Sequence, residues 1–134
     1  MKKILPLLLA LLMLACNRTK HNSASDHAYS MLERVAELNA GGDKQGALAL
    51  ADSALRMHPA DTTRCWLLSE KAVTLVDMGR MADAVGVAQG AYRLAEKLHD
   101  VDAMLNLRGT MGIAYRRLGK TDSALVQYKE GIQM

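Results

Sequence analysis

Apolar residues recur along most of this chain at the spacing of an α-helix. In three stretches they fall one, three or four residues apart, which places them on one side of a helix. These stretches are Met31, Leu32, Val35 and Leu38; Leu68, Ala72, Leu75 and Val76; and Leu107, Met111, Ala114, Tyr115 and Leu118. Helix starts are indicated by Asp61-Thr62-Thr63 and by Asp100. The pattern predicts six helices, over about 26–40, 43–57, 62–78, 81–98, 101–118 and 121–134.

The composition agrees with an all-helical chain. Ala and Leu favour helices, whereas sheets rely on β-branched and aromatic residues, and this sequence has no Phe, four Tyr and one Trp. The net charge of +3 includes Lys2 and Lys3, which belong to a segment that we expect to be removed. Without them the chain has 15 basic and 14 acidic side chains. So small an excess does not predict nucleic-acid binding, which depends on many phosphate contacts.

The first 15 residues have the layout of an export signal. Lys2 and Lys3 precede an apolar run over 4–15. This run is too short to span a membrane, which takes roughly 20 residues, but it fits a secretory signal. Met13-Leu14-Ala15-Cys16 resembles a bacterial lipobox, which implies cleavage before Cys16 and lipid attachment to it. Ordinary secretion is the alternative. Residues 16–25 are polar and predict a flexible tether.

Three segments of the remaining chain share one frame. In each, a Gly is followed five residues later by an Ala: Gly42 and Ala47, Gly79 and Ala84, Gly119 and Ala124. A Gly after a helix supplies the left-handed conformation that ends it, and small residues let paired helices approach closely. The three glycines lie 37 and then 40 residues apart. Self-similarity at a period of this length predicts three stacked helical hairpins.

Residues 107–134 resemble a tetratricopeptide repeat. Its signature positions hold Met111, Gly112, Tyr115, Gly119, Ala124, Tyr128 and Gly131. The earlier segments match less fully, because Arg34 and Val35 replace the usual Leu-Gly pair and Arg80 replaces the usual acidic cap. The resemblance implies an all-α fold over 26–134: a right-handed superhelical stack of about three helix-turn-helix hairpins, an α-solenoid.

The last hairpin lacks a polar helix after it, so we expect an exposed apolar face on helices 101–118 and 121–134. Three explanations stay open: the sequence continues in a longer protein, another protein covers this end, or copies associate through it.

Residues that carry catalysis do not occur in useful arrangements. His21, His27, His58 and His99 fall in the tether or near helix ends, without Cys or carboxylate partners at metal-ligand spacing. Cys65, the remaining thiol, is interpreted as a small apolar core residue, with a redox or bridging role as the alternative. We therefore expect no catalytic residues, metal or cofactor, and not an enzyme.

In tetratricopeptide repeats, partners bind a concave face built from the first helix of each hairpin. The corresponding positions here are Tyr29, Leu32, Ala36, Asn39, Trp66, Ser69, Val73, Val76, Asp77, Asn106, Ile113, Arg116 and Arg117. The face runs from apolar at Leu32, Val73 and Val76 to basic at the two Arg, which suggests an amphipathic helix or extended peptide as ligand. The alternative is that Trp66 and Tyr29 are half-buried residues of the hydrophobic core.

These features together predict a non-catalytic scaffold that binds a protein or peptide. The lipobox resemblance implies a lipoprotein of the bacterial cell envelope, anchored through Cys16 to the outer membrane on its periplasmic or surface side. One alternative is the repeat region of a longer signalling protein. Another is a glycan-capture lipoprotein, which five aromatic residues make a poor fit.

Overall fold

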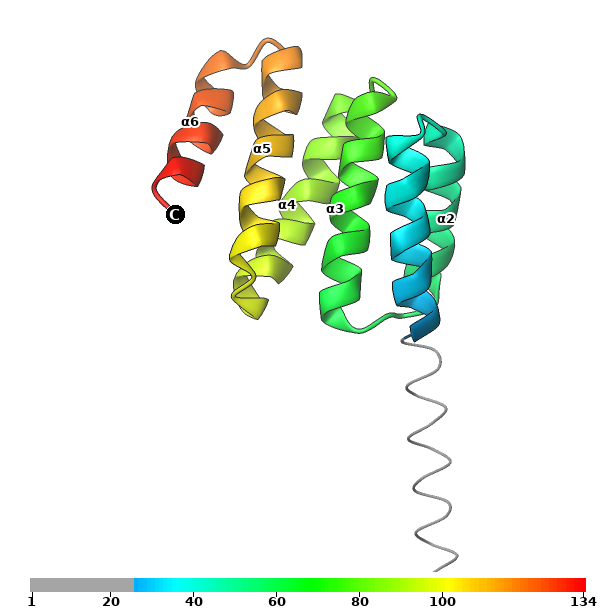
Figure 1. Ribbon diagram of the computed structural model, residues 1–134. Coiled ribbons are helices and arrows are strands. Elements are labelled where there is room, and N and C mark those ends of the chain that lie inside the picture. The colour runs from blue at the N-terminus through cyan, green and yellow to red at the C-terminus, as the bar shows by residue number, and fades with distance from the viewer. Residues whose placement is uncertain (1–25) are drawn as a thin grey trace, which may run out of the picture.

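The computed structural model describes residues 26–134 of the protein (Figure 1). The expected signal segment 1–15, the lipidation site Cys16, the tether over 16–25 and His21 lie outside the described residues. Over 26–134 the chain forms six helices and no strand. They are the helix over 26–40, α2 (Lys44–Arg56), α3 (Asp61–Asp77), α4 (Met81–Leu98), α5 (Val101–Arg117) and α6 (Thr121–Ile132).

Consecutive helices pair into three hairpins, which we call units 1, 2 and 3. Unit 1 is the helix over 26–40 with α2, unit 2 is α3 with α4, and unit 3 is α5 with α6. Figure 1 shows the units side by side, with unit 1 at one end of the stack and unit 3 at the other. Unit 2 contacts both neighbours, since α3 packs against α2 and α5, and α4 packs against α5. The all-α stack of hairpins is confirmed, and the predicted helix bounds hold to within one or two residues.

The glycines of the repeat frame end the first helix of each unit. Gly42, Gly79 and Gly119 have φ of +82°, +79° and +76°, the left-handed region that disfavours a Cβ. Among the helix starts, the Asp100 carboxylate accepts a hydrogen bond from the Ala103 amide and caps α5. Asp61 stands in the first turn of α3 and makes no side-chain cap. The sequence signal there therefore marked the helix start correctly but not how it is stabilised.

Small side chains set how closely the paired helices approach. Ala47, Ala84 and Ala124 are all buried, as the repeat frame predicts. Gly112 of α5 lies directly under the ring of Tyr128 of α6. Across the unit 2–unit 3 boundary, Ala88, Ala91 and Ala95 of α4 meet Ala103, Leu107 and Met111 of α5 in one core cluster. Stacking of neighbouring units, rather than any one hairpin, therefore forms the core.

Unit 3 leaves apolar surface uncovered. Leu105 of α5 is 41% exposed, and Leu125 and Ile132 of α6 are 48% and 86% exposed. The predicted exposed apolar face on the last two helices is thus confirmed. No helix within 26–134 has the length and apolar character to span a membrane.

Candidate partner-binding surface

The first helices of the three units lie in one layer, with α2 and α4 behind them and α6 beside α5 (Figure 1). Residues at repeat-equivalent positions form rows across this layer. One row is Tyr29, Trp66 and Asn106, and the next, seven residues further along each helix, is Ala36, Val73 and Ile113. Asp77 and Arg117 continue the same stripe four residues beyond Val73 and Ile113. We call this surface the first-helix face.

Hydrogen bonds between units fix the polar side chains beside this face. The Trp66 indole Nε1 donates to Asp100 Oδ2 at 3.1 Å, which ties α3 to the start of α5. The Asn39 amide donates to the Glu70 carboxylate at 2.8 Å, and the Thr74 hydroxyl donates to Asn39 Oδ1 at 2.8 Å. The face therefore presents side chains whose positions are already set before a ligand arrives.

Most of the predicted face residues can reach a ligand. Tyr29, Ala36, Asp77, Asn106, Arg116 and Arg117 are exposed, and Leu32, Asn39, Trp66, Val73 and Ile113 are partly buried. Trp66 matches the alternative interpretation in part, because its indole is already hydrogen-bonded within the protein.

For Ser69 and Val76 the prediction of partner contact is wrong. Ser69 is 0% exposed and its hydroxyl donates to the Cys65 carbonyl, while Val76 is 5% exposed within a core cluster. Val76 shares this cluster with Ala114 and Ile113 of unit 3. Arg116 is the repeat equivalent of Val76, and it stays exposed because no further unit follows within the described residues.

The face predicted from the sequence does not include two acidic residues, Glu33 and Glu70. Glu33 and Glu70 stand four residues after Tyr29 and Trp66, so each continues the stripe of its helix by one turn. That spacing is the signal that could have found them. With Asp77 they make units 1 and 2 acidic, and Arg117 in unit 3 is the basic end. The expected change from apolar to basic is therefore a change from acidic to basic around an apolar centre.

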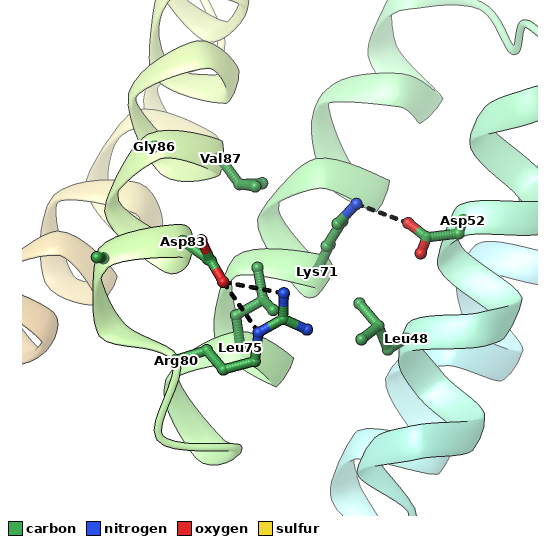
Figure 2. Close-up of a pocket in the computed structure, with 9 residues that line it drawn as sticks. Leu48, Asp52, Lys71, Leu75, Arg80, Asp83, Gly86 and Val87 are labelled. Carbon is green, nitrogen blue, oxygen red and sulfur yellow. Dashed lines mark hydrogen bonds and ion pairs between the residues drawn. The ribbon is translucent and has the colours of Figure 1, made fainter.

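A separate pocket of about 430 Å³ lies between α2, α3 and α4, on the side of the second helices (Figure 2). Its charged groups pair with one another: Lys71 Nζ lies 2.6 Å from Asp52 Oδ1, and Arg80 Nη2 lies 2.9 Å from Asp83 Oδ2. Because these pairs neutralise each other, the pocket has no excess charge that would favour an ionic ligand.

Cys65 is part of the core, as predicted. Its side chain is 0% exposed and the thiol donates to the Ala91 carbonyl at 3.6 Å. Burial raises the pKa of this thiol above its ordinary value, and the negative charge of Asp100 adds to the shift. A buried neutral thiol is a poor nucleophile. Over residues 26–134, no group of three or more His, Cys, Asp or Glu could hold a metal ion.

Comparisons with known proteins agree with this architecture. Residues 63–134 match the tetratricopeptide repeat family. Among solved structures, the crystal structure of the TPR domain of Arabidopsis FLU is similar, with a TM-score of 0.76 over 82% of this chain and 95% of that chain. At 14% identity this likeness shows the shared fold alone. A comparison with curated proteins gave no match.

Proposed function

Because the chain belongs to the tetratricopeptide repeat family, whose domains are typically non-catalytic protein-interaction modules, we propose that it is a scaffold of the bacterial cell envelope. A lipid on Cys16 anchors it, and its first-helix face binds an amphipathic helix or an extended peptide of a partner protein. The envelope location rests on the lipobox resemblance. The binding mode rests on the arrangement of the three first helices.

One observation carries the binding mode: the row formed by Ala36, Val73 and Ile113. Packed helices lie about 8–10 Å apart, so a row across three of them spans roughly 20 Å. An extended peptide covers that distance with about six residues at roughly 3.3 Å each. Val73 and Ile113 are only partly buried, so both keep apolar surface that a ligand side chain can cover.

Charges beside the row set the direction of the ligand. Glu70 and Asp77 lie on unit 2, while Arg117 lies on unit 3, where its Nη1 donates to the Val76 carbonyl at 3.3 Å. A ligand with basic residues over units 1 and 2 and an acidic residue over unit 3 would complement this face. Such complementarity favours one orientation and rejects the reverse.

The binding mode is tested by changing Val73 and Ile113 together to Glu. Partners are captured from detergent-solubilised membranes with the tagged full chain and identified, and binding is then measured with the purified partner. The control is Val126→Glu, an equivalent change at a 49% exposed residue of α6. We expect the double variant to lose binding and the control to keep it. Undiminished binding by a folded double variant would exclude the first-helix face.

The anchor is tested separately with Cys16→Ser. Metabolic labelling with a palmitate analogue should mark the natural chain and not the variant, and the variant should leave the membrane fraction. Equal labelling of both chains, or equal membrane retention, would contradict lipidation at Cys16.

A further inference from the structure

The end of unit 3 carries an open groove between α5 and α6. It has a volume of about 480 Å³. Its lining is Leu105, Arg108, Gly109, Gln127, Tyr128, Gly131 and Ile132. We call it the end groove.

The same groove exists one unit earlier, where it is filled. Each residue of unit 3 has an equivalent in unit 2 that stands 40 positions earlier, as Gly79 stands 40 positions before Gly119. Leu105, Gly109, Tyr128, Gly131 and Ile132 correspond to Cys65, Ser69, Ala88, Ala91 and Tyr92. The first four of these unit 2 residues are buried, and Cys65, Ala88 and Ala91 share one core cluster with Ala103, Leu107 and Met111 of α5. The end groove is therefore the next position of an interface that the structure already contains.

The helix that fills the earlier groove shows what the end groove accepts. α5 presents Ala103, Leu107 and Met111, a small residue followed by two larger apolar ones at intervals of four, and all three are buried. We propose that the end groove binds an amphipathic helix of a partner protein that presents a small residue, Leu and Met, or similar side chains, at i, i+4 and i+8. The partner helix would pack on unit 3 as α5 packs on unit 2.

A second copy of this chain does not offer such a helix. The equivalent positions on the helix over 26–40 are Asp26, Ser30 and Arg34, all exposed and polar. Head-to-tail stacking would bury an Arg34 that now pairs with Glu37 at the surface, which is costly. The matching faces of α3 and α5 are already used inside the stack. A second copy of this chain is therefore a poor source of the helix.

Charge at the rim adds a preference. Arg116 is exposed at the position equivalent to Val76, whose carbonyl oxygen accepts a hydrogen bond from Arg117 near the end of α5. A docked helix would bring the residue that corresponds to Arg117, near the C-terminal end of that helix, close to Arg116. An acidic residue there would pair with Arg116, whereas a basic one would be repelled. The preferred partner helix is thus acidic at this position.

The α5 sequence itself serves as the probe. A fluorescein-labelled peptide of residues 100–120 is titrated with the full chain and followed by fluorescence anisotropy. The control peptide spans residues 26–42, whose docking positions are polar. We expect saturable binding of the first peptide only, and tighter binding of an Arg117→Glu version of it.

Variants of the full chain locate the binding site. Leu105→Glu and Ile132→Glu should each weaken binding at least about tenfold, as loss of a central interface residue does. Val126→Glu, on the same helix but outside the groove, should leave it unchanged. Val73→Glu, on the first-helix face, should also leave binding of the peptide unchanged. The proposal for the end groove can therefore fail while the proposal for the first-helix face holds, and the reverse.

Two results would overturn the proposal. One is that the α5 peptide shows no saturable binding, or shows binding that Leu105→Glu and Ile132→Glu do not weaken. Binding of the second kind is expected if the peptide displaces α5 from unit 2. The other is a dimer of the chain alone in sedimentation that both variants dissociate, which would make a second copy the occupant.

Discussion

Replacing Gly112 with Ala tests the contact that joins α5 to α6. Gly112 lies inside α5, where Ala is the better helix former by about 1 kcal/mol. In this structure, however, a Cβ at residue 112 would meet the ring of Tyr128, with the Cζ atom only 2.7 Å away. The ring or the whole of α6 must move to admit the methyl group. Steric overpacking of this kind costs about 1–3 kcal/mol.

The matched comparison is Gly86→Ala in α4. A Cβ there would meet nothing within 4 Å, so this change keeps the gain in helix propensity without the clash. We therefore expect Gly86→Ala to raise the free energy of unfolding by about 1 kcal/mol. Gly112→Ala should lower it by up to about 2 kcal/mol, since the clash outweighs the same gain.

Urea denaturation of the full chain, followed by far-ultraviolet circular dichroism, measures both changes. A Tyr128→Ala background removes the ring, and in that background Gly112→Ala should become as stabilising as Gly86→Ala. A clash between residue 112 and the Tyr128 ring would be refuted if Gly112→Ala stabilised the natural chain as much as Gly86→Ala does. It would also be refuted if the Tyr128→Ala background did not change the effect of Gly112→Ala.

Three further predictions concern single residues. Asp100→Ala removes both the α5 cap and the acceptor of the Trp66 indole, so it should cost about 2 kcal/mol in urea denaturation followed by tryptophan fluorescence, while Asp100→Asn should cost less. Gly79→Ala forces a Cβ into a φ of +79° and should cost about 1–2 kcal/mol by the same assay; a neutral effect would contradict the turn geometry. The pKa of the Cys65 thiol is raised in the folded chain, so the folded state keeps this proton to higher pH than the unfolded state does. The contribution of the thiol to the free energy of unfolding is therefore full below its ordinary pKa and declines as pH rises above that value. In a Cys16→Ser chain, iodoacetamide should label Cys65 rapidly only after unfolding; rapid labelling of the folded chain near neutral pH would contradict its burial.

Most of the fold could be predicted because its signals are local. The glycines that end the first helices need positive φ, and each apolar stretch fixes one side of its helix. The alanine five residues after each glycine faces the paired helix. These are properties of single hairpins, and the helix bounds follow from them closely.

The surface was harder to predict because exposure depends on neighbouring units. Ser69 and Val76 lie on α3, a first helix like those that carry the exposed face residues. Both are nevertheless buried, Val76 in one cluster with Ala114 of unit 3. Arg116 repeats the position of Val76 and stays exposed. The bond from Trp66 to Asp100 joins residues 34 apart in sequence, and no local pattern indicates it. Periodicity thus identified the side of each helix, whereas stacking decided which of those sides stay open.

Photocrosslinking in living cells tests whether the first-helix face binds the partner. A photoreactive residue replaces Val73 on this face or, as the control, Arg93, which is exposed on α4 in the layer of second helices. We expect a crosslinked partner from position 73 and little from position 93. Equal crosslinking from both positions, or crosslinking from position 93 alone, would contradict it.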